Sequence, residues 1–119
     1  MTFADAIILA LLAHCLGDWL FQNAWISDNK SNWKHPASLL HALIHGACLL
    51  VVFGPIVPGW IFVIVPLHWL IDLRFALVWW RKEFRMTTEG PVALHVAIWQ
   101  DQACHFVSIV LVVWGFIRK

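Results

Sequence analysis

The sequence contains few charged residues. Asp, Glu, Lys and Arg make up only 13% of its 119 residues, whereas 61% are hydrophobic and the mean hydropathy is +0.76. A soluble domain would carry about 25% charged residues, so this composition argues against an ordinary soluble globular protein. The net charge of +1 provides no basic patch, so no nucleic-acid partner is expected. The composition indicates a small polytopic membrane protein whose surroundings are the lipid bilayer.

Three further features are missing from the sequence: a C-x-x-C pair, a basic segment before the first apolar stretch, and a Gly-x-Ser-x-Gly motif. The three cysteines, Cys15, Cys48 and Cys104, show no C-x-x-C spacing. We interpret them as small buried hydrophobic residues, with metal ligation by Cys15 or Cys104 as the alternative. No basic segment precedes the first apolar stretch, which we therefore interpret as a retained helix and not as a cleaved signal peptide. There is no Gly-x-Ser-x-Gly motif to supply a serine nucleophile.

The long apolar segments predict an all-α fold, a polytopic membrane protein built as a four-transmembrane-helix bundle. We expect one domain over residues 1–119, because no linker or low-complexity segment divides the chain. The predicted helices span about residues 3–22, 38–53, 60–80 and 91–117. Pro66 lies inside the third of these helices and predicts a kink there.

The polar connections predict the orientation in the membrane. Residues 23–37 and 81–90 together carry five basic residues, whereas the opposite side carries only Arg118 and Lys119. By the positive-inside rule, we expect the 23–37 and 81–90 loops to be cytoplasmic and both termini to lie outside.

Histidine and aspartate recur in pairs four residues apart, one pair in each predicted helix. The twelve His and Asp residues would form about one such pair by chance, but four occur. Side chains four apart leave the same face of a helix. All four pairs are predicted at a similar depth, in the half of the membrane nearest the polar connections, so they can meet in one layer. The pairs are His14 and Asp18, His41 and His45, His68 and Asp72, and Asp101 and His105.

These eight residues predict a metal site inside the bundle. Ionisable side chains in a membrane cost several kcal/mol unless they pair or bind something, and the predicted helices contain no lysine to neutralise the three carboxylates. Imidazoles beside carboxylates suit one or two divalent transition-metal ions, with zinc as our first choice and iron or manganese as alternatives. Two ions sharing a bridging aspartate is the first interpretation, and one ion with supporting aspartates is the second. Interhelical hydrogen bonding without a metal is the structural alternative.

A metal site of this kind predicts hydrolysis by metal-activated water. Divalent ions activate bound water and hold a phosphoryl oxygen, and Asp18, Asp72 and Asp101 are the candidate catalytic carboxylates. The expected substrate is a lipid-linked or amphiphilic phosphoester, because the site lies within the membrane. Three further polar residues are candidates to bind substrate or to support the ligands: Gln22, Gln102 and Arg74.

Residues 12–22, read as LAHCLGDWLFQ and followed by Asn29-Lys30, resemble the opening of a known group of proteins. This is an uncharacterised family of small bacterial and phage integral membrane proteins with a His…Gly-Asp-aromatic…Gln motif. The resemblance extends to the three later His/Asp pairs and implies the membrane topology, the site positions and a bacterial inner-membrane location. A more distant likeness, to predicted membrane-bound metal-dependent hydrolases with His-x-x-x-Asp in short hydrophobic helices, implies hydrolase activity.

Two other functions fit the same sequence. A ring of histidines and aspartates could pass a divalent metal ion or protons through the membrane, as in a transporter or channel. The chain could also be a non-catalytic membrane partner or regulator, in which case the eight residues would not be needed for partner binding. A homodimer is as compatible with four short helices as a monomer is.

Overall fold

The computed structural model describes residues 1–86 and 89–118, and within them the chain is helical and has no strands. The all-α prediction is therefore confirmed. In chain order, the elements are α1 (Phe3–Cys15), the π-helix η1 (Leu16–Leu20), α2 (Ala24–Asn29), α3 (Pro36–Phe53), α4 (Ile61–Asp72), α5 (Phe75–Glu83) and α6 (Ala93–Ile117).

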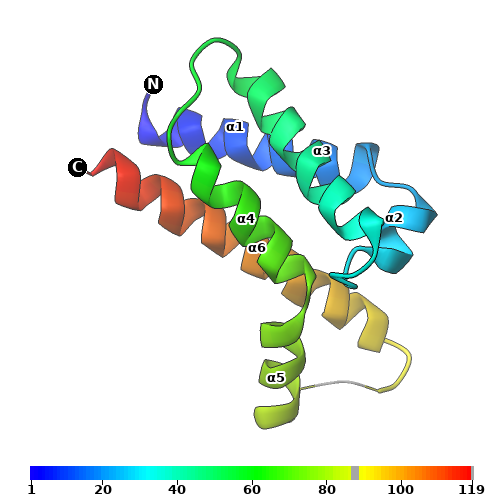
Figure 1. Ribbon diagram of the computed structural model, residues 1–119. Helices are drawn as coiled ribbons and strands as arrows, with labels where there is room; N and C mark the ends of the chain where they lie inside the picture. Colours follow the sequence, from blue (N-terminus) through cyan, green and yellow to red (C-terminus); the bar gives the residue numbers. More distant parts are fainter. Residues whose placement is uncertain (87–88, 119) are drawn as a thin grey trace.

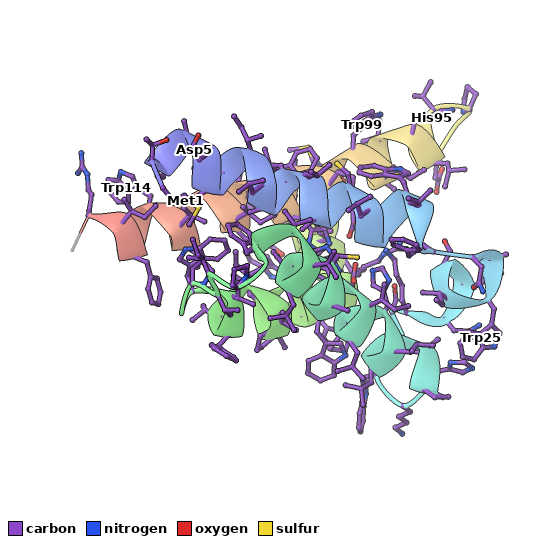
Figure 2. The ribbon with its side chains drawn as sticks, turned by 90° about the horizontal axis from the view of Figure 1, so that it is seen from above. Met1, Asp5, Trp25, His95, Trp99 and Trp114 are labelled. Atoms are coloured by element: carbon purple, nitrogen blue, oxygen red, sulfur yellow. The ribbon has the colours of Figure 1, made fainter. Side chains whose placement is uncertain are left out.

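Several of these helices are long and apolar enough to cross a membrane. Three segments meet this condition alone, namely Phe3–Leu20, α3 and α6, and α4 with α5 forms a fourth if the bent pair is one span. Figure 1 shows both termini at the same end of the molecule. In Figure 2, Met1 and Trp114 lie at that end, whereas Trp25 and Trp99 lie toward the other.

The first predicted helix is continuous in direction but not uniform in geometry. α1 begins at a capping box, in which Thr2 Oγ1 accepts the Asp5 N–H at 3.1 Å and Asp5 Oδ2 accepts the Thr2 N–H at 2.9 Å. After Cys15 the helix widens into η1, where the Phe21 N–H donates to the Leu16 carbonyl at 2.9 Å, five residues back. Such π-turns often occur at functional sites, and this one buries Gly17 and Asp18.

The predicted loop over residues 23–37 is wrong in part, because it contains the short helix α2 and the start of α3. Asn23 caps α2, its Oδ1 accepting the Ile26 N–H at 2.9 Å. α3 begins at Pro36 and not at residue 38, because His35 Nδ1 accepts the Ala37 N–H at 3.1 Å and proline suits the first helical turn.

The predicted third helix over residues 60–80 is also wrong, because the chain breaks within it. α4 continues through Pro66 and ends at Asp72, and α5 leaves it at an angle of 52°. The break lies at Leu73 and Arg74, where Arg74 adopts the left-handed conformation with φ 63°. The last helix, predicted from residue 91, begins at Ala93 after the left-handed turn at Gly90.

The bundle has an apolar half and a polar half. α1 packs against α3 and α6, and α4 also packs against both. Toward the termini the helices meet through small side chains on α1, and Ala6, Ala10 and Ala13 are fully buried there. The outer surface is apolar, with Val51 79% and Phe62 75% exposed. The polar residues are instead gathered inside, toward α2.

Candidate metal centre

The structure brings all eight of the paired His and Asp residues together in the polar half of the bundle. Each of these side chains is buried, with exposed fractions between 0 and 4%. They come from α1, η1, α3, α4 and α6, and each contacts at least one other member of the set. The four pairs therefore do share one layer, as their spacing predicted. We call this set of eight the His/Asp cluster.

Three members of the His/Asp cluster, His41, His68 and Asp72, approach one another closely. Asp72 Oδ2 lies 3.0 Å from His68 Nε2 and 3.2 Å from His41 Nε2, and the two Nε2 atoms are 3.2 Å apart. Each Nε2 carries at most one hydrogen, so these contacts cannot all be hydrogen bonds. Asp72 Oδ2 in fact makes no hydrogen bond to any described residue.

A fourth ligand atom lies beside these three. Asp18 Oδ1 is 3.0 Å from His41 Nε2 and 3.7 Å from His68 Nε2. Ligand atoms bound about 2.05 Å from a tetrahedral zinc ion lie about 3.3 Å from one another, so most of these separations fit a common ion. Three groups of buried ligands are close enough to hold a metal: His14, Asp18, His45 and His68; His41, His68 and Asp72; and Asp18, Asp101 and His105.

The second oxygen of Asp72 faces the other side of the cluster. Asp72 Oδ1 lies 3.2 Å from His105 Nε2, which is 3.8 Å from Asp101 Oδ2. Asp101 Oδ1 is buried and makes no hydrogen bond within the part of the chain that the structure describes. Asp72 therefore has one oxygen toward His41 and His68 and the other toward His105, which is the arrangement of a bridging carboxylate.

Lys30 also reaches the cluster, and sequence reasoning missed it. The residue follows α2 directly, is only 3% exposed, and places its Nζ 3.4 Å from Asp72 Oδ1. The prediction that no lysine could neutralise the carboxylates is therefore wrong, because α2 folds back and carries Lys30 in from the connection. The Asn29-Lys30 pair beside the opening motif was the only available signal.

Gln102 and two of the histidines support the cluster by a chain of hydrogen bonds. Gln102 Nε2 donates to Asp18 Oδ2 at 2.9 Å, because a carboxylate can only accept. Gln102 Oε1 must then accept from His14 Nε2 at 2.8 Å, which leaves His14 Nδ1 to accept from His45 Nε2 at 2.9 Å. Both nitrogens of His14 are thus engaged, and the chain fixes the orientation of Asp18.

Gly17 is a second residue whose role the sequence did not reveal. A Cβ atom at this position would lie 2.7 Å from His45 Cδ2, closer than real side chains approach. The ring of His45 has little freedom to move, since it stacks on His68 with centroids 3.6 Å apart. Only glycine at this π-turn lets His45 occupy its place.

None of the other candidate residues belongs to the three ligand groups. Gln22 is half-buried, and its Oε1 makes no hydrogen bond among the described residues. Arg74 is exposed at the break between α4 and α5 and forms no hydrogen bond to the cluster in the described ranges. Cys15 is exposed and Cys104 is half-buried, and neither belongs to the ligand groups. His95, a histidine outside the four pairs, is exposed on α6.

The charges of the site favour a bound cation. With the three carboxylates ionised and the five imidazoles neutral, as metal ligands must be, Lys30 supplies the one positive charge and an excess of two negative charges remains. Uncompensated charge in a buried site is strongly unfavourable. A divalent ion would restore neutrality and would give a partner to Asp72 Oδ2 and Asp101 Oδ1, which make no hydrogen bond among the described residues. The buried His and Asp residues could therefore hold a metal ion.

Comparison with known proteins places the chain in one family. The family described as "Protein of unknown function (DUF3307)" matches residues 6–119, which includes all eight members of the His/Asp cluster. A search of curated proteins and a search of solved structures gave no match. The match covers nearly the whole chain, and the protein therefore belongs to the DUF3307 family.

Proposed function

We propose that this protein is an intramembrane metal-dependent hydrolase that acts on a lipid-linked or amphiphilic phosphoester. The observation that carries the proposal is the meeting of Asp18, His41, His68 and Asp72, whose ligand atoms approach within 3.0–3.7 Å without enough hydrogens to join them. Such a set is built to share a cation. Zinc is our first choice, because two imidazoles and two carboxylates suit it well.

The surroundings of the His/Asp cluster support a location in the membrane and a lipid-like substrate. The outer faces of the bundle expose large apolar side chains, as lipid contact favours, and the ionisable residues face inward. We propose that the connections over residues 23–37 and 81–90 face the cytoplasm of a bacterium, with the bundle in the inner membrane. The cluster would then lie in the cytoplasmic half of the bilayer, within reach of a phosphorylated headgroup.

The proposed roles divide between holding the ion and moving a proton. A divalent ion in such a site makes water a better nucleophile and polarises a phosphoryl oxygen. Asp18, Asp72, His41 and His68 would hold it, and Gln102 would keep Asp18 in position. Asp101 is the proposed proton acceptor, because its Oδ1 is buried within the cluster and has no hydrogen-bond partner among the described residues.

Hydrolysis by the purified protein tests this proposal. Zinc-loaded protein in detergent is incubated with an alkyl phosphomonoester, an alkyl diphosphate and an alkyl phosphodiester of the same chain length. We expect at least one to be hydrolysed, and Asp101→Asn to lower the rate about 100-fold or more while the metal content stays unchanged. His95→Ala, an exposed histidine on the same helix, is the matched control and should be fully active. Zinc-loaded wild-type protein that hydrolyses none of the three would contradict the proposal.

One observation favours transport as the second candidate. α4 ends at Asp72 and the chain bends by 52° beside the cluster, and transporters bind ions at broken helices of this kind. The carbonyl end of α4 also favours a cation at this place. Zinc uptake into proteoliposomes, without hydrolysis of any of the three substrates, would select transport over hydrolysis.

A further inference from the structure

The position of Lys30 bears on how many metal ions the cluster can hold. Asp72 offers one oxygen to each side, so a cation could sit on either side of this carboxylate. The first place is bounded by Asp72 Oδ2, His41 and His68. The second is bounded by Asp72 Oδ1, His105 and Asp101. The first interpretation from the sequence was two ions that share a bridging aspartate, without assigning which aspartate.

The ammonium group of Lys30 stands at the second place. Its Nζ lies 3.4 Å from Asp72 Oδ1, the same oxygen that His105 Nε2 approaches at 3.2 Å. A metal ion on that oxygen would bind at about 2.1 Å. A divalent ion and an ammonium group sharing one carboxylate oxygen would repel each other strongly in a buried site. Lys30 and a second metal ion therefore exclude each other.

The charges of the cluster lead to the same conclusion. With the imidazoles neutral and the carboxylates ionised, three carboxylates and Lys30 leave two negative charges, which one divalent ion neutralises. A second divalent ion beside Lys30 would instead leave two positive charges in a site whose members are at most 4% exposed. Burial of such an excess is unfavourable, so one ion is the balanced state.

We infer that Lys30 serves as a built-in cation in place of a second metal ion, so that the wild-type cluster holds one divalent ion, between His41, His68 and Asp72. Asp72, Asp101 and His105 then form a latent metal site, which becomes available when the charge of Lys30 is removed. This inference rests on the proposed metal centre and specifies its stoichiometry.

Metal stoichiometry in variants of Lys30 tests the inference. Purified protein is equilibrated with zinc, free ion is removed, and zinc per chain is measured by elemental analysis. We expect one equivalent for the wild type and for Lys30→Arg, which keeps the charge. Two equivalents are expected for Lys30→Met, which keeps the length of the side chain without the charge. Lys34→Met, an exposed lysine in the same connection, is the matched control and should bind one.

The possible results distinguish a wrong role for Lys30 from the absence of a metal centre. Two equivalents in the wild type, or one in a folded Lys30→Met variant, would overturn the role of Lys30 but leave a metal centre in place. Should Lys30→Met not fold, the wild-type titration decides alone, since one equivalent supports the inference and two contradict it. Adding Asp101→Asn to Lys30→Met should return the stoichiometry to one. A wild type that binds no zinc would contradict the proposed function itself.

Discussion

Replacing Gly17 by alanine should weaken metal binding although no proposed ligand is changed. The added Cβ would lie 2.7 Å from His45 Cδ2, whereas non-bonded carbons are comfortable at about 3.5–4.0 Å. The ring of His45 would have to move by roughly 0.8 Å to restore an ordinary contact. It is held on one side by stacking on His68 and at its edge by the hydrogen bond to His14.

The expected losses of stability and of zinc affinity follow from how tightly the His45 ring is held. Adding a methyl group to a packed interior typically costs about 1–3 kcal/mol. A displaced His45 also disturbs the chain through His14 and Gln102 that orients Asp18. Loss of such supporting contacts typically lowers metal affinity about 10- to 100-fold. We therefore expect Gly17→Ala to fold with a lowered melting temperature and to bind zinc 10- to 100-fold more weakly.

Competition with a fluorescent zinc chelator in detergent measures the affinity, and thermal unfolding with and without zinc measures the stability. Gly115→Ala is the control, because a Cβ there would meet nothing within 4 Å. It changes the same residue type within a helix, and alanine should favour that helix slightly. Equal zinc affinity and equal stability in the two variants would refute the argument that Gly17 makes room for His45.

Three further predictions follow from the same geometry. Gln102→Leu should keep the fold but lower zinc affinity about 10- to 100-fold, because Asp18 and His14 lose the side chain to which both are hydrogen-bonded. Unchanged affinity in the chelator assay would argue against a supporting role for this chain of hydrogen bonds. Arg74→Gly should raise the thermal stability by roughly 0.5–1 kcal/mol, because glycine adopts a φ of 63° without strain. Zinc binding should stay unchanged. Lower stability of this variant would contradict backbone strain at the break between α4 and α5. Zinc affinity should fall as the pH is lowered, by up to about tenfold per pH unit for each imidazole ligand, because only the neutral ring binds metal. Zinc titrations that give the same affinity at every pH would exclude histidine ligands.

Much of the cluster could be predicted from the sequence because its signal is local. His and Asp four residues apart share a helix face wherever the helix forms, so the pairing of His68 with Asp72 follows from spacing alone. That the pairs also share a layer followed from counting residues from the polar connections. The structure gathers all eight side chains at that level.

The parts that could not be predicted depend on contacts between distant segments or on unusual backbone geometry. Lys30 enters the site because α2 folds against α3, and nothing local distinguishes it from the exposed Lys34. The break after Asp72 occurs at an arginine in a left-handed conformation, whereas the visible helix breaker was Pro66. Pro66 lies inside α4, where its missing N–H removes one backbone hydrogen bond, yet α4 continues through it to Asp72.

The widened turn at η1 had no recognisable signal either. A run such as Leu16–Leu20 is compatible with an ordinary α-helix, and only the packing of His45 against Gly17 shows why glycine stands there. The glycine of the opening motif thus gains a physical reason in the structure that the motif alone did not supply.

The most direct test is the zinc content of the purified wild-type protein beside that of a His41→Ala, His68→Ala double variant. We predict about one tightly held equivalent in the wild type and almost none in the double variant, because the close Nε2 atoms supply half of the proposed ligands. Wild-type protein that remains free of bound metal after exposure to zinc, iron and manganese would contradict this prediction.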